Sequence, residues 1–168
     1  MDQNIDPVAG RELQELIALI KKLRAPDGCP WDRKQTKQDM GKHVLDEAYE
    51  VFDALAADHL PHIQEELGDL LFLILFTAEV AAESGEFTIA DAMKSIREKM
   101  IRRHPHVFGD VQVNSVEDVK DNWQEIKKQE RNGTPAEHNI FSTIPRSLPA
   151  LKRAQKITSA ASRVGFDW

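Results

Sequence analysis

Residues 43–80 read HVLDEAYEVFDALAADHLPHIQEELGDLLFLILFTAEV and carry two acidic pairs of identical spacing. The members of each pair are three residues apart, and they are Glu47 with Glu50 and Glu66 with Asp69. On a helix this spacing points both carboxylates of a pair to the same face. Pro61, between the pairs, suits the first turn of a helix and poorly suits a helix interior. The stretch therefore predicts two antiparallel helices joined by a short turn.

The two pairs lie at similar distances from that turn, so the four carboxylates are expected to converge. Asp69 is followed by the apolar segment Leu70–Phe76, and we expect its carboxylate to face a core. Converging acids would repel each other and lose hydration, at a cost on the order of several kcal/mol per ion unless a cation neutralises them. An all-oxygen set suits Mg²⁺, or Mn²⁺ in its place, better than zinc. The alternative is that these acids form the solvated rim of an ordinary helical hairpin.

Length and composition fit one domain that is free in the cytoplasm. The chain has 168 residues, and its longest apolar run is too short to cross a bilayer. Residues 1–4 do not resemble a secretion signal, and Cys29, the only cysteine, fits a reducing compartment. The formal net charge of −6 argues against nonspecific nucleic-acid binding. We therefore expect neither a membrane nor a nucleic acid as partner.

Helical periodicity recurs along the chain and predicts an all-α fold, a bundle of about five to six helices around the central hairpin. The predicted helices are 11–24, 36–57, 61–82, 88–103, 115–130 and 149–164. Thr36 and Thr88 are expected to be N-caps. One domain over residues 1–168 is expected, with a bundle core at 11–131, a linker at 132–148 and a C-terminal helix and tail at 149–168. Val107–Val113 is a candidate for a small hairpin of strands.

Three cations lie at the end of the helix predicted at 88–103. Lys99, Arg102 and Arg103 share one face, an arrangement that can bind phosphate. Cations at a helix C-terminus are also common as solvated groups favoured by the helix dipole, and the spacing leaves this alternative open. Trp123 lies on the apolar stripe of its own helix, so its ring can serve core packing or base stacking.

Five different motifs follow one another between about Arg11 and the end of the chain. They are Cys29–Asp32 (CPWD), Asp46–Glu50 (DEAYE), Glu65–Leu71 (EELGDLL), Lys99–Phe108 (KMIRRHPHVF) and Val164–Trp168 (VGFDW). Together they resemble the MazG-type nucleoside triphosphate pyrophosphohydrolases of the all-α NTP pyrophosphatase superfamily. The two acidic pairs alone would be a weak signal, but RRHPHVF and CPWD make the resemblance specific. Asp46 stands where the family often has Glu, ahead of the metal-binding pair.

The resemblance implies hydrolysis of (deoxy)nucleoside triphosphates to monophosphates and pyrophosphate, in housecleaning of the nucleotide pool. It implies Mg²⁺ held by the positions Glu47, Glu50, Glu66 and Asp69. It implies substrate contacts from Lys99, Arg102, Arg103 and Trp123, and we add His43 as a further substrate-binding candidate. Glu50 is the preferred residue to orient or deprotonate the attacking water, with Glu47 as the alternative.

The segment Leu70–Phe76 is apolar on more sides than one packing layer covers, which predicts a homodimer or higher oligomer. The resemblance to the MazG family, whose members dimerise, points the same way. Family members commonly carry two such domains in tandem, and Gly165–Trp168 resembles the end of a first copy. The alternative function is therefore a catalytically weak or inactive domain that binds nucleotide and dimerises within a tandem MazG protein. The intact set of four acids argues against it.

Overall fold

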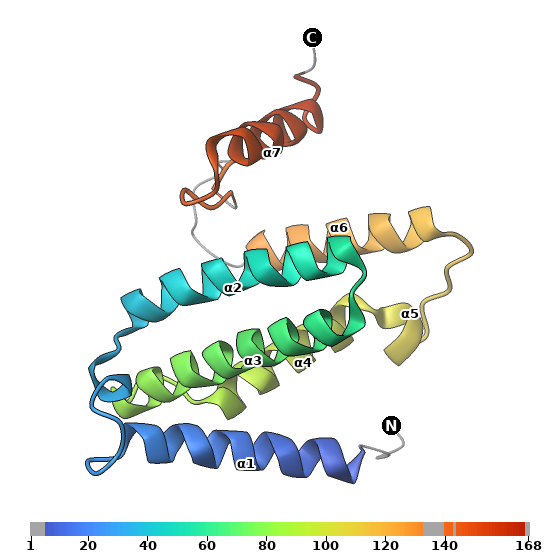
Figure 1. Ribbon diagram of the computed structural model, residues 1–168. Coiled ribbons are helices and arrows are strands. Elements are labelled where there is room, and N and C mark those ends of the chain that lie inside the picture. Colours follow the sequence, from blue (N-terminus) through green and yellow to red (C-terminus); the bar gives the residue numbers. More distant parts are fainter. Residues whose placement is uncertain (1–5, 133–139, 143, 167–168) are drawn as a thin grey trace. The chain divides into compact units, whose positions relative to one another are not determined.

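The structure, a computed structural model, describes residues 6–132, 140–142 and 144–166. Within these residues it contains α-helices, one short 3-10 helix and no strand (Figure 1). The elements are α1 (Pro7–Arg24), η1 (Asp32–Lys34), α2 (Lys37–Ala57), α3 (Leu60–Glu83), α4 (Ile89–Arg103), α5 (Pro105–Phe108), α6 (Val116–Asn132) and α7 (Ala150–Ser162). The predicted all-α fold is confirmed.

The segment Val107–Val113 is the clearest local error of the sequence prediction. It forms no strand hairpin, because Pro105 starts a fresh helical turn that includes Val107 and Phe108. Proline at the first helical position is favoured, since its missing N–H would have no partner there anyway. The short helix α5 is therefore one more helix than the pattern indicated.

Backbone contacts divide the chain into two compact units, Met1–Met100 and Ile101–Trp168, and each is described by itself. The single domain expected from chain length stays a prediction. Residues 133–139 and 143 of the predicted linker, and residues 167–168 of the predicted tail, lie outside the described residues.

The hairpin of α2 and α3 forms as its end signals predict. At the start of α2, the Thr36 side chain accepts from the backbone N–H of Asp39, and the Asp39 carboxylate accepts from the backbone N–H of Thr36. At its end, Asp58 adopts a left-handed conformation with φ of 52°, and Pro61 lies in the first turn of α3. The two helices then pack antiparallel along each other (Figure 1).

The apolar core of the first unit lies beside the C-terminal half of α3. Its fully buried members are Ile20, Met40, Leu75, Phe76 and Val80. Helix α1 packs against α3 at this level and supplies further apolar side chains to the core. The acidic pair of α3 lies in the other half of the helix, so folding of the hairpin does not depend on burying all four acids.

Arg24 at the end of α1 fixes the loop that leads into α2. Its guanidinium donates to both oxygens of Glu83, at 2.7 and 2.6 Å, and lies 5.2 Å from the centre of the Phe76 ring. It also donates to the main-chain carbonyls of Asp32 at 2.6 Å and Gln35 at 3.3 Å. The loop and η1 are therefore tied to both α1 and α3. The same ion pair lowers the pKa of Glu83.

None of the helices in the described part of the chain combines the length and apolar character needed to cross a membrane.

Replacing Arg24 with Ala is expected to lower the free energy of unfolding by about 2–4 kcal/mol, because it leaves the two part-buried carbonyls and Glu83 without their donor. Urea unfolding followed by circular dichroism measures the loss. Lys22→Ala is the matched control. It removes an exposed ion pair with Asp27 and should cost much less than the loss of Arg24. Equal losses in the two variants would contradict the role given to Arg24.

Candidate functional site

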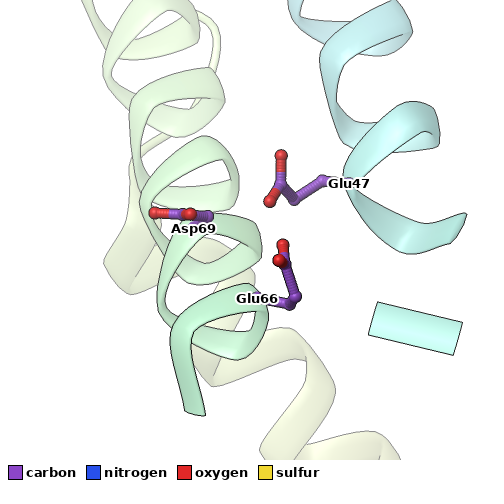
Figure 2. Close-up of side chains that lie close together, drawn as sticks. All are labelled: Glu47, Glu66 and Asp69. Carbon is purple, nitrogen blue, oxygen red and sulfur yellow. The ribbon is translucent and has the colours of Figure 1, made fainter. Parts of the chain in front are cut away.

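Three of the four acids predicted as metal ligands meet between α2 and α3. Figure 2 shows Glu47 of α2 reaching toward Glu66 and Asp69 of α3. One carboxylate oxygen from each of the three lies within 4.8 Å of the other two. The antiparallel packing brings Glu47 level with two residues that are one helical turn apart on α3. This acidic group, Glu47 with Glu66 and Asp69, is the candidate metal site.

Burial within the acidic group differs from the sequence prediction. Glu66 is buried, Glu47 is half-buried and Asp69 is exposed, so the expectation that Asp69 faces the core is wrong. The fully buried apolar residues of that helix begin only at Leu75, so the apolar run that follows Asp69 does not bury its carboxylate. Asp69 therefore precedes the core, and its carboxylate remains open to solvent.

Glu50 is exposed on α2 and does not belong to the close group of three. Its charge still acts on that group, since it is one of the causes that raise the pKa of Glu47. Two roles of Glu50 stay predictions. One is that it is a fourth metal ligand, and the other is that it orients or deprotonates the attacking water.

Without a cation, Glu47 binds a proton at higher pH than an ordinary glutamate does. Burial and a hydrogen bond with Glu66, together with the charges of the neighbouring carboxylates, raise the pKa of Glu47 to about 7. The Nε2 atom of His62, one helical turn before Glu66, lies 2.6 Å from a Glu66 oxygen. These contacts offset part of the repulsion within the group. Protonation of Glu47, which is hydrogen-bonded to Glu66, removes more of the repulsion as the pH falls through about 7.

The donor set fits a hard divalent cation. All three side chains are carboxylates, and their oxygens are near enough to one another to bind one ion. Such an ion would displace the proton of Glu47, because ligating carboxylates must be deprotonated.

A cavity of about 160 Å³ adjoins the acidic group, because Glu47 belongs to that group and also lines the cavity. Aromatic side chains of Trp31, Phe72 and His43 form part of its wall. The Trp31 and His43 rings are 6.3 Å apart, centre to centre. The predicted substrate-binding residue His43 is therefore placed beside the acidic group.

The predicted phosphate-binding arginines belong to the second unit. Arg102 and Arg103 both bind the Glu130 carboxylate of α6, at 2.7 and 2.6 Å. These two contacts lower the pKa of Glu130. Lys99, on α4 in the first unit, is half-buried.

Trp123 of α6 is 37% exposed, so its ring is not buried in a core. Core packing is one of the two roles that the sequence leaves open for it. Its ring lies 6.1 Å from that of His104, and the Lys127 ammonium lies 5.2 Å from the Trp123 ring centre. One face of the indole is thus already in a cationic environment.

Three residues with clear roles in this geometry were not singled out by the sequence. The four-residue spacing of His62 and Glu66 on one helix is a signal that could have been found. Asp32 lies within the CPWD motif, but no local pattern indicates that its side chain is buried. Glu130 meets two arginines 27 and 28 residues away in sequence, a distance over which spacing predicts nothing.

Residues 35–108 match the family model of the MazG nucleotide pyrophosphohydrolase domain. This segment thus matches a MazG domain, and most of the chain is similar to proteins of that family. It is 44% identical over 158 residues to a nucleoside triphosphate pyrophosphohydrolase of Escherichia coli strain K12, a match covering 94% of this chain and 60% of the relative. A nucleoside triphosphate pyrophosphohydrolase/pyrophosphatase MazG of Thermotoga maritima is 42% identical, with coverages of 95% and 60%.

A solved structure supports the same relationship. The crystal structure of a MazG-related protein from Thermotoga maritima matches with a TM-score of 0.59 and 29% identity. The match covers 68% of this chain and 98% of the other. The chain thus spans about 60% of the length of its curated relatives from Escherichia coli and Thermotoga maritima, and nearly all of the solved relative.

The metal-free protein should lose stability relative to a Glu47→Gln variant as the pH rises from about 5 to 8. The pKa of Glu47 is about 7 in the folded protein, against 4.5 ordinarily, so the folded state binds more protons in this window. Stability that is present below the lower value is lost as the pH passes the higher one.

Thermal unfolding of both proteins over this pH range measures the effect. Added Mg²⁺ should restore the parent at pH 8 by offsetting the charge that deprotonation creates. A difference in melting temperature that does not change with pH would contradict the raised pKa.

Proposed function

We propose that the protein hydrolyses (deoxy)nucleoside triphosphates to nucleoside monophosphates and pyrophosphate, with Mg²⁺ as cofactor and Mn²⁺ as a substitute. The observation that carries this proposal is the meeting of Glu47, Glu66 and Asp69 beside a cavity, within the segment 35–108 that matches the MazG domain model. Two relatives bear the name nucleoside triphosphate pyrophosphohydrolase, which supports it. Housecleaning of the nucleotide pool in the cytoplasm is the proposed role.

The acidic group is proposed to hold the Mg²⁺ ion, with Glu50 as an additional ligand or a proton acceptor. A bound cation supplies positive charge against the phosphate oxygens and promotes ionisation of water. Glu50 is exposed and lies outside the close group, so its carboxylate is available to orient and deprotonate the attacking water. Glu47 is the alternative base, since a pKa of about 7 suits proton transfer near neutral pH.

Lys99, Arg102, Arg103, Trp123 and His43 are proposed to contact the nucleotide. Arg102 and Arg103 share the single carboxylate of Glu130, so this group of three keeps a positive charge. A triphosphate carries more negative charge than one carboxylate and can compete for the same N–H donors. The exposed part of Trp123 offers a ring face to the substrate.

Incubation with Mg²⁺ and each nucleoside triphosphate, followed by detection of pyrophosphate, tests the proposed reaction. Asp69→Asn should lower turnover by about two orders of magnitude or more, because it removes one charge of the acidic group while Asp69 itself is exposed and not needed for packing. Glu65→Gln, an exposed acid on the same helix, is the matched control.

Unchanged Mg²⁺-dependent turnover in folded Asp69→Asn would remove Asp69 from the site. Failure of the parent to release pyrophosphate from any nucleotide would favour the noncatalytic nucleotide-binding and dimerisation domain instead.

A homodimer or higher oligomer is also proposed, on the basis of the apolar outer face of the hairpin. Its side chains are 42–66% exposed, and they are Leu45, Tyr49 and Phe52 on α2 and Leu67, Leu71 and Ile74 on α3. On each helix they recur every three to four residues, so each helix contributes one face. Exposed apolar stripes of this kind are typical of a protein interface, and a second copy of the chain would cover them symmetrically.

Light scattering at micromolar concentration should give a mass of at least two chains of 19.1 kDa. Phe52→Lys should shift the protein toward a single chain, because Phe52 is 66% exposed and a charge there cannot be buried cheaply. Asp53→Asn, at the adjacent exposed position, is the control. A mass of one chain for the parent at all concentrations would contradict the interface.

A further inference from the structure

Asp32, in the CPWD motif, is a buried charged residue whose nearest cationic partner is Arg24. The residue is 9% exposed and lines the 160 Å³ cavity next to Glu47. Arg24 donates to the main-chain carbonyl of Asp32 and not to its carboxylate. Among the described residues, no hydrogen bond or ion pair to that carboxylate is found. Because Asp32 lines the cavity and its oxygens are not among the buried atoms without a partner, a ligand in the cavity can donate hydrogen bonds to the carboxylate.

The other walls of the cavity fit a flat heterocycle. Trp31 is 62% exposed, and its ring is tilted by 56° against that of His43, with Phe72 also lining the space. Aromatic side chains around a hydrogen-bonding edge are the usual way in which proteins hold a nucleobase. A volume of 160 Å³ is below that of sites for whole drug-sized ligands, so the cavity suits one base and not an entire nucleotide.

The cavity lies beside the acidic group, so a base bound in it would be close to the proposed site of hydrolysis. Glu47 lines the cavity and is also a member of the acidic group, so the two share a wall. A nucleotide with its base in the cavity would direct its phosphates toward the carboxylates. This step rests on the proposed hydrolysis of nucleoside triphosphates.

We propose that the cavity binds the nucleobase of the substrate and that Asp32 selects guanine. A carboxylate offers two acceptor oxygens and no donor. Guanine presents two adjacent donors, N1–H and the N2 amino group, which can engage both oxygens at once. Adenine and cytosine offer one amino donor beside a ring acceptor. Uracil and thymine place their single N–H between two carbonyl oxygens, which the carboxylate repels.

The loop holds Asp32 in position before substrate arrives. Arg24 binds the carbonyls of Asp32 and Gln35, and the Gln35 amide donates to the Trp31 carbonyl at 3.4 Å. A residue fixed in this way loses little conformational freedom on binding, which sharpens its discrimination between bases.

Kinetics with GTP, ITP and XTP test the proposal, since inosine lacks the N2 amino group and xanthine carries an oxygen there. The parent should rank kcat/KM as GTP above ITP above XTP. Asp32→Asn offers one acceptor and one donor, which match N1–H and O2 of xanthine, so it should lower the GTP-to-XTP ratio by about 100-fold or more. The ratio is measured on one preparation and does not depend on how much of the variant is folded.

Asp27→Asn is the matched control, because Asp27 is an exposed acid in the same loop that does not line the cavity. Its GTP-to-XTP ratio should equal that of the parent. Calorimetry with α,β-methylene analogues of GTP and XTP, which cannot release pyrophosphate, provides a second readout of the same preference.

The outcomes separate the two proposals. Suppose that Asp32→Asn changes the binding preference from the GTP analogue toward the XTP analogue, but that no nucleotide is turned over. This result would support base selection and overturn the proposed hydrolysis. Turnover with equal GTP-to-XTP ratios in the parent and Asp32→Asn would overturn base selection and leave the hydrolysis standing. Absence of both turnover and binding would overturn both.

Discussion

The gathering of like charges between α2 and α3 is the constraint on which the rest of this structure depends. Burial, the hydrogen bond with Glu66 and the charges of the neighbouring acids raise the pKa of Glu47 to about 7, and burial of Glu66 removes water that would screen the repulsion. Two packed helices accept such a group only if other contacts hold them together. In this protein those contacts lie at the other end of α3, where Ile20 and Phe76 are almost completely buried.

This separation explains how a destabilising site and a stable hairpin coexist. The capping box at Thr36 and the left-handed residue Asp58 set the ends of α2, and the core sets its packing against α3. The acidic group then takes its geometry from a framework that it does not have to support. A cation bound to it would add stability to a fold that is already formed, since binding to the folded state alone stabilises that state.

Arg24 connects the core to the functional region. Its guanidinium lies over Phe76, pairs with Glu83 and holds the carbonyls of the loop that carries Asp32. One side chain therefore contacts both the core and the loop that forms part of the cavity wall. In the second unit Glu130 does comparable work by holding Arg102 and Arg103 together, so the basic residues are also organised by an acid distant in sequence.

The sequence by itself determined the all-α class, the caps at Thr36 and Thr88 and the two acidic pairs, because helix periodicity, caps and turns act between residues a few positions apart. Only the tertiary structure decided that Glu66 is the buried acid and Asp69 the exposed one, that Glu50 lies outside the close group, and that Asp32 lines a cavity. Each of these facts depends on how α2, α3 and the loop that carries Asp32 pack against one another. Such facts arise from packing between elements, and no local spacing in the chain encodes them.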